Sequence, residues 1–147
     1  MKKILIPVMI ITFSLGCILS GCSAAGEEAV SFADDVTEDY LTAINDGNFE
    51  NFKKDLGEEM LQAMPEDEFI KFSSYLNDTI GDYVQDSKEV TASGVQKGMD
   101  VIVYQTDYTG EDEKVKVTIV ISKNENGDYK ISGSWFDSPK LREKNYQ

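Results

Sequence analysis

The spacing of the apolar residues changes once along this chain, and that change constrains the fold class. Up to Gly81, apolar side chains recur every three or four residues, which is the spacing of amphipathic helices. From Tyr83 onward they tend to alternate with polar residues, which is the spacing of half-buried strands. Helices followed by consecutive strands predict an α+β domain, with the helices packed on an antiparallel meander of four strands.

We expect three helices before the sheet. The first covers about 28–46, the second starts after Asn48 and is interrupted at Gly57, and the third begins at Pro65. Gly81 is expected to end the third helix. The apolar residues predicted to face the core are Ala29, Ala33, Val36, Tyr40, Ala43, Ile44, Phe49, Phe52, Leu56, Phe69, Phe72, Leu76 and Ile80.

The second part of the chain predicts four strands joined in sequence order. They lie near 83–95, 99–109, 113–123 and 128–137. Gly110-Glu111 predicts a two-residue turn, and Glu125-Asn126-Gly127 predicts a three-residue turn with a left-handed glycine. These turns set the strand register, and a one-residue slip would expose the whole apolar set. The predicted cross-strand pairs are Tyr104 with Val117, Ile102 with Ile119, Asp107 with Lys114, Ile121 with Ile131, Val117 with Trp135, and Lys123 with Tyr129.

This register sorts the strand residues into two faces. The face predicted to lie under the helices carries Ile102, Tyr104, Thr106, Val115, Val117, Ile119, Ile121, Tyr129, Ile131 and Trp135. The opposite face mixes polar residues with a smaller apolar patch, which consists of Val101, Val103, Val120 and Phe136. An apolar patch on an exposed face is a candidate surface for a protein partner or for a second copy of the chain.

The N-terminal residues predict an export leader that ends in a lipid anchor. Lys2 and Lys3 precede an uncharged stretch, 4–20, whose 17 residues fall short of the roughly 20 of a transmembrane helix. The stretch ends in Leu19-Ser20-Gly21-Cys22, which resembles the lipobox of bacterial lipoproteins. That resemblance implies cleavage before Cys22 and a diacylglycerol thioether on its sulfur, with acyl chains of the palmitate type. Two acyl chains suffice for stable anchoring to the extracytoplasmic side of the cell membrane.

Two alternatives to this interpretation stay open. An uncleaved membrane helix would leave Cys22 unmodified. Lipidation of Cys17 would require a leucine where Ser14 stands, and it would shorten the apolar stretch. With cleavage before Cys22, the expected organisation is a signal peptide at 1–21, a tether at 22–28, a helix-plus-sheet domain at 29–139 and a frayed tail at 140–147.

The chain that remains after this cleavage is acidic and lacks histidine. Its 126 residues contain 27 acidic and 12 basic side chains, a net charge of −15. Such a surface is repelled by nucleic-acid phosphates and by anionic lipids, so we expect no nucleic-acid partner and expect the acyl chains to hold the domain at the membrane. The absence of histidine, and of cysteine after Cys22, excludes Ser-His, Cys-His, His-metal and disulfide arrangements. Oxygen ligation of calcium or magnesium stays open, but a calcium-loop pattern around Gly127 fails, so we expect no metal site and no cofactor.

An ordered set of short motifs spans about 29–137 and carries a family resemblance. The motifs are Tyr40, Leu41 and Ile44, Asn45-Asp46-Gly47-Asn48-Phe49, Met60 with Met64-Pro65, Ile80-Gly81-Asp82-Tyr83 and Tyr129-Lys130-Ile131-Ser132-Gly133. The chain resembles a family of uncharacterised domains in exported bacterial and archaeal proteins. More broadly it resembles the nuclear transport factor two-like superfamily, also called ketosteroid isomerase-like or cystatin-like. The resemblance implies a curved sheet around a long helix with a pocket at the open end, and it implies no activity.

Three functions follow from these observations. We favour a non-catalytic, membrane-anchored domain that binds a protein partner, or its own copy, through Val101, Val103, Val120 and Phe136. The second is a binder of a small apolar or cationic molecule. Its pocket would be lined by Tyr40, Phe72, Tyr104 and Trp135.

The third function is an isomerase-like or other enzyme. It needs a carboxylate base, such as Asp107 or Asp137, beside a neutral donor, such as Tyr40, Tyr83 or Tyr104. The predicted register places Asp107 on the face away from the helices, opposite Lys114. We therefore assign no catalytic residue and expect a protein that is not an enzyme.

Overall fold

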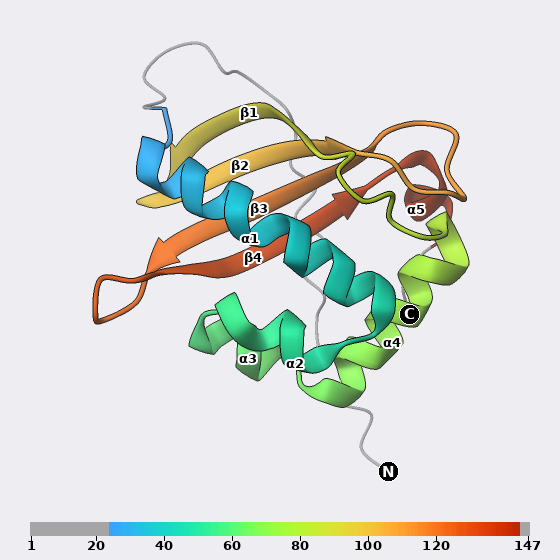
Figure 1. Cartoon of the computed structure of the whole chain (residues 1–147), viewed down its shortest axis with the longest axis horizontal. Helices are drawn as coiled ribbons and strands as arrows, with labels where there is room; N and C mark the ends of the chain where they lie inside the picture. The colour runs from blue at the N-terminus through green and yellow to red at the C-terminus, as the bar shows by residue number, and fades with distance from the viewer. Residues whose placement is uncertain (1–23, 145–147) are drawn as a thin grey trace.

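The computed structural model describes residues 24–144, so the predicted signal peptide and Cys22 lie outside the described residues. A four-stranded antiparallel sheet in the order β1-β2-β3-β4 is combined with helices, which confirms the α+β class (Figure 1). The elements are α1 (Glu27–Asp46), α2 (Phe49–Phe52), a 3-10 turn (Lys53–Asp55), α3 (Glu58–Ala63), α4 (Glu66–Ile80), β1 (Glu89–Gln96), β2 (Met99–Thr106), β3 (Val115–Lys123), β4 (Tyr129–Asp137) and α5 (Pro139–Glu143).

Two long helices, α1 and α4, precede the sheet, and the expected middle helix is divided into short pieces. The chain leaves the helical path at Leu56, which forms a parallel bridge with Ile131 of β4. The Gly57 N–H then donates to the Ile131 carbonyl at 2.9 Å. These backbone contacts replace helical hydrogen bonds, so the helix is interrupted and a new helix, α3, begins at Glu58.

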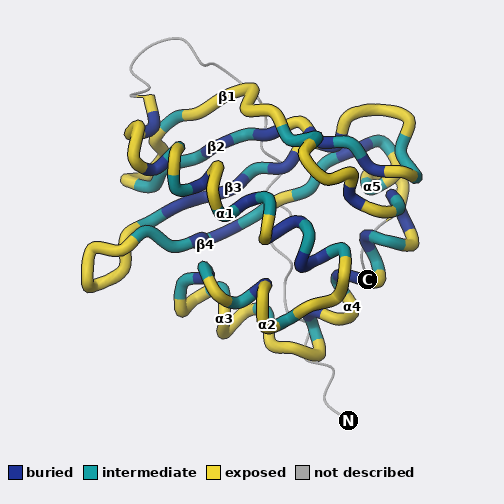
Figure 2. Tube along the Cα trace, in the orientation of Figure 1, coloured by how far each residue is buried: buried dark blue, intermediate teal, exposed yellow. Residues whose placement is uncertain are grey.

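The core lies between the helices and one face of the sheet, here called the inner face. Figure 1 shows α1 crossing this face, and Figure 2 shows that β2, β3 and β4 are far more buried than the edge strand β1. Tyr40 of α1 stacks on Phe52 at 5.1 Å between ring centroids, and Phe52 lies 4.4 Å from Phe69 of α4. The Tyr40 phenol also forms a hydrogen bond with the Ser134 hydroxyl of β4 at 2.7 Å, which links the helix to the sheet.

Four of the six predicted cross-strand pairs are confirmed. They are Tyr104 with Val117, Ile102 with Ile119, Ile121 with Ile131, and Lys123 with Tyr129. Gly127 has the expected left-handed conformation at φ 83°.

The predicted two-residue turn at Gly110-Glu111 is wrong. β2 and β3 end at Thr106 and Val115, and the eight residues between them form a loop. The Gly110 N–H donates to the Ile80 carbonyl at 2.8 Å, so the loop reaches back to the end of α4 instead of closing a tight hairpin. Asp107 and Lys114 still meet, through an ion pair of 2.8 Å.

The predicted pairing of Val117 with Trp135 is also wrong, because β4 contains a bulge. Val120 pairs with Gly133 and Ile121 with Ile131, so Ser132 is an additional residue in β4. Beyond the bulge every side chain changes face. Phe136 pairs with Val117 and points to the inner face, while Trp135 pairs with Thr118 on the opposite face.

The segment predicted to be a frayed tail, 140–147, overlaps the short helix α5, and its last three residues lie outside the described residues. Ser138 caps α5 by accepting from the Leu141 N–H, and the Tyr75 phenol of α4 donates to the Lys144 carbonyl at 2.6 Å. Within residues 24–144, the structure contains no helix of the length and apolar character needed to span a membrane.

Gly81 allows the close approach between the end of α4 and the loop before β3. It adopts φ 79° and ψ −156°, a region open almost only to glycine, and a Cβ here would stand 2.5 Å from the Gly110 nitrogen. We expect Gly81→Ala to cost about 1–3 kcal/mol of unfolding free energy from backbone strain, plus about 1–3 kcal/mol from overpacking. Gly98→Ala is the matched control, because Gly98 has φ 78° but no atom near its added Cβ. If urea denaturation shows that both variants lose the same unfolding free energy, the close contact between Gly81 and Gly110 makes no separate contribution, and the prediction is wrong.

Four tyrosines of the core predict loss of stability at alkaline pH. Burial raises the pKa of Tyr40, Tyr83, Tyr104 and Tyr108 above the ordinary value of 10.0. Above pH 10 the unfolded chain therefore loses protons that the folded chain keeps, so stability is complete below this pH and falls as the pH rises. Tyrosinate absorbance and far-ultraviolet circular dichroism should change together as the pH rises. In Tyr40→Phe the free energy of unfolding should fall less steeply with pH. Ionisation of these tyrosines in a chain that stays folded would contradict the prediction.

Candidate interaction face of the sheet

The face of the sheet turned away from α1, here called the outer face, carries an apolar patch. Val101 and Val103 of β2 alternate with the fully buried Ile102 and Tyr104, which places the two valines outward. Val120 of β3 pairs with Val101 and lies beside them. These three residues occupy the outer face as the sequence predicted.

Trp135, and not Phe136, completes this patch. Its side chain is 45% exposed. A Cβ on Gly133 would stand 3.0 Å from Cη2 of the indole and 3.8 Å from Cβ of Val120, so the indole and Val120 meet above the glycine. The outer patch is defined here as Val101, Val103, Val120 and Trp135. Phe136 is corrected to the inner face, where its ring contacts Phe72 at 5.7 Å.

The polar residues beside the outer patch include two lysines in a chain that is otherwise acidic. Lys116 pairs with Gln105 and with Asp137, and Lys130 pairs with Ser122, so Lys116, Lys130 and Asp137 all lie on the outer face. Arg142 binds Asp137 through two nitrogen–oxygen contacts of 2.7 and 2.6 Å and lowers the pKa of this carboxyl. The Asp137 charge is therefore compensated, so the rim of the outer patch combines Lys116 and Lys130 on the side of β3 and β4 with the acid Glu89 on the side of β1.

The charge is distributed unevenly between the two parts of the domain. Residues 24–82, which form α1 to α4, contain 16 acidic and three basic side chains. Residues 83–144, which form the sheet and α5, contain 11 acidic and nine basic ones. The helical layer therefore carries most of the negative charge, and the outer face lies on the less acidic side.

The four residues predicted to line a pocket do not share one. Tyr40 and Tyr104 are buried side chains of the core, at 3% and 0% exposure, and Phe72 packs against Phe136. Trp135 lies on the opposite face of the sheet. The bulge in β4 is the physical reason, because it turns Trp135 away from the helices.

Tyr104 nevertheless has polar neighbours. The Lys88 ammonium lies 5.5 Å from the Tyr104 ring centroid and 3.2 Å from Asp34 of α1. Burial raises the pKa of Tyr104, and Thr37 and Asp34 lie close enough to modify that shift. These contacts join β2, α1 and the segment before β1, so they stabilise the packing of the helix on the sheet.

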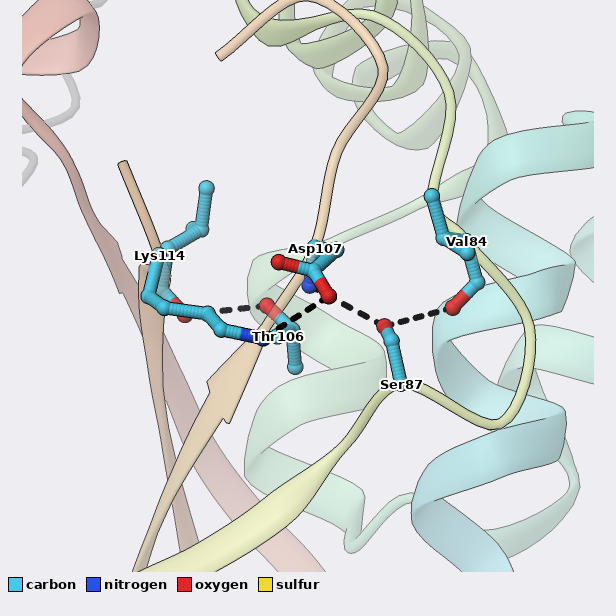
Figure 3. Close-up of polar contacts among 6 residues, drawn as sticks. Val84, Ser87, Thr106, Asp107 and Lys114 are labelled. Carbon is cyan, nitrogen blue, oxygen red and sulfur yellow. Dashed lines mark hydrogen bonds and ion pairs between the residues drawn. The ribbon is translucent and has the colours of Figure 1, made fainter. Parts of the chain in front are cut away.

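The two acids proposed as catalytic bases are both held in ion pairs. Figure 3 shows the Lys114 ammonium donating to Asp107, and the Asp107 N–H donates to Ser87 at 3.0 Å. The Asp107 side chain is 47% exposed, and that of Asp137 is 40% exposed beside Arg142. Of the candidate donors, Tyr40 is bonded to Ser134 and Tyr83 to Glu38. The proposed acids and phenols therefore do not converge.

Glu38 was missed in the sequence, where it reads as an ordinary acid on the polar side of the first helix. One carboxylate oxygen accepts from the Tyr83 phenol at 2.9 Å, and the other accepts from the Asp86 N–H at 2.9 Å. Asp86 has a left-handed φ of 61°. Glu38 thus fastens the segment between α4 and β1 to α1, and the sequence signal for this role is weak, since only the fold brings these residues together.

Other binding features are sparse in the described part of the chain. Within residues 24–144, no group of three or more His, Cys, Asp or Glu side chains is arranged to hold a metal ion. An open groove of about 400 Å³ lies against Thr79 of α4 and Lys140, Glu143 and Lys144 at the C-terminal end. The outer patch is therefore the strongest candidate for recognition.

The fold and the outer face describe an α+β domain with one sheet face buried by helices and the other offered to solvent. Residues 37–133 match the family described as "Protein of unknown function (DUF3887)". This match covers most of the chain, and the chain belongs to that family. No curated protein and no solved structure matches the chain at a significant level.

Proposed function

We propose that the protein is a lipid-anchored, extracytoplasmic, non-catalytic domain that binds a protein partner through its outer patch. The partner brings an apolar side-chain cluster flanked by acidic groups. The observation that carries this proposal is the exposed Trp135, which shares with Val101, Val103 and Val120 a sheet face that the helices leave uncovered.

The anchor is supported by the sequence before the domain. A basic start, an uncharged stretch of 17 residues and the sequence Leu-Ser-Gly-Cys follow one another without interruption. The described chain then enters α1 at Glu27, which leaves a very short link to Cys22. Such a link is compatible with a domain held close to the bilayer.

The chemistry of the outer patch supports a partner with acidic flanks. Tryptophan is one of the residue types enriched at the energetic centre of interfaces, and here the indole lies over Gly133 and near Val120. Lys116 and Lys130 favour negative groups opposite them.

Wider kinship with the nuclear transport factor two-like superfamily, and a sheet curved into a cone, are part of this proposal. The order of the elements supports them, because long helices precede an antiparallel meander. The alternative of a pocket for a small molecule receives no comparable support. Its predicted lining is divided between the core and the outer face.

Removal of the Cys22 sulfur should release the domain from the membrane. We expect full-length Cys22→Ser to lose the acyl modification and to leave the membrane fraction, as judged by mass spectrometry and by fractionation of the producing cells. Cys17→Ser is the matched control and should stay acylated and membrane-bound. Two results would contradict the anchor: loss of the acyl modification in Cys17→Ser but not in Cys22→Ser, or wild-type chain in which Cys22 is unmodified.

A photo-crosslinking amino acid placed on the outer face should capture the partner in cells. Thr118 is suitable, because it pairs with Trp135 and lies between Lys116 and Val120. The same amino acid at Ile70, an exposed apolar residue of α4, is the control. The identified partner is then purified and titrated. We expect Trp135→Ser to weaken its affinity about tenfold or more and Lys116→Glu to weaken it in a salt-dependent way, whereas Lys54→Glu on the helical layer has little effect.

Three results would contradict this proposal. One is a crosslinked product that contains two copies of this chain and nothing else. Another is a partner that binds Trp135→Ser and wild-type chain equally. The third is a higher affinity after Lys116→Glu. Circular dichroism of each variant checks that the domain remains folded.

A further inference from the structure

The chain enters the domain at the end of the sheet that carries two hairpin turns. The Gly26 N–H donates to Oδ1 of Asp100 at 3.1 Å, and Asp100 is the second residue of β2, close to the turn between β1 and β2. The Gly26 carbonyl then accepts from Val30 as α1 begins. Figure 1 shows the turn between β3 and β4, residues 124–128, projecting at this same end of the molecule. Here this end is called the hairpin end.

The opposite end of the domain, here called the distal end, is built from different segments. The 20 residues of α1 correspond to a helix of about 30 Å, which leads away from the hairpin end. At the distal end, Gly110 contacts Ile80 at the end of α4, and the Lys140 N–H of α5 donates to Glu111 at 3.1 Å. The loop between β2 and β3 therefore marks the distal end.

The link between Cys22 and the first fixed residue is short. Four residue steps separate Cys22 from Gly26, and a fully extended chain covers at most about 14 Å over that distance. A domain about 30 Å long cannot turn over on such a link while Gly26 stays bonded to Asp100. We infer that the hairpin end faces the bilayer surface. This inference rests on the proposed acylation of Cys22.

The charges at the hairpin end indicate that the link, and not adsorption, sets this orientation. Acids outnumber bases at this end: Glu27, Glu28, Asp100, Glu125 and Asp128 lie there, against Lys97 and Lys123 at the strand ends. Such a mixture gives no strong attraction to anionic headgroups.

Energy transfer to labelled lipids tests the orientation on the whole acylated protein. Glu125→Cys at the hairpin end and Asp112→Cys at the distal end are matched, since each replaces an exposed acid in a turn or loop. Each variant is labelled with a donor dye and reconstituted into vesicles of phosphatidylethanolamine and phosphatidylglycerol that contain an acceptor dye on the headgroup. We expect transfer from position 125 to exceed transfer from position 112 by about twofold or more, given a separation on the order of the 30 Å length of α1.

The hydrogen bond to Asp100 provides the second comparison. Asp100→Ala removes the acceptor for Gly26 and should reduce the difference between the two labelled positions, whereas Asp100→Asn keeps an acceptor oxygen and should preserve it. Equal transfer from both positions, or stronger transfer from position 112, in acylated protein bound to vesicles would overturn the orientation alone. Protein that is not acylated and does not bind vesicles would overturn the proposed anchor, and the orientation with it.

Discussion

The attachment of α1 to the inner face of the sheet is the interaction on which the rest of this domain depends. Tyr40 illustrates it, because its ring packs on Phe52 while its phenol is bonded to Ser134 of the last strand. A helix of this length gains most of its stability from packing, and the sheet in turn needs a cover for one face. The same attachment fixes the segment between α4 and β1 through Glu38, and so the edge of the sheet as well.

The elements of the fold were largely predictable, because they depend on local patterns. The helical spacing before Gly81 and the alternation after Tyr83 predicted the α+β class, and the turn at Gly127 fixed the pairing of Ile121 with Ile131. The bulge at Ser132 was not predictable in the same way. Beyond the bulge the indole of Trp135 lies over Gly133 and near Val120 of the neighbouring strand, and the sequence alone does not bring these groups together. The broken middle helix likewise depends on a backbone contact with β4.

The residues of the outer face were likewise predicted in part: strand register placed some of them correctly, and the bulge moved the others. Val101, Val103 and Val120 were placed correctly by the register between β2 and β3, whereas Trp135 and Phe136 were exchanged by the bulge. Because of this exchange the outer face carries Trp135 in place of Phe136, and the indole has a larger apolar surface than a phenyl ring. The exchange also removes Trp135 from the predicted pocket, whose other members Tyr40 and Tyr104 are core residues. Asp107 and Asp137 were considered as candidate bases, but the structure pairs them with Lys114 and Arg142.

The contact of Leu56 and Gly57 with Ile131 has a consequence for how the sheet ends. A free strand edge is a template for pairing with another chain. Here the β4 edge is partly occupied by this internal segment, and β1 at the other edge is distorted by its own irregularity between Val90 and Ala92. Neither edge offers a long regular ladder. The domain can thus expose one sheet face for recognition while resisting growth into a continuous intermolecular sheet.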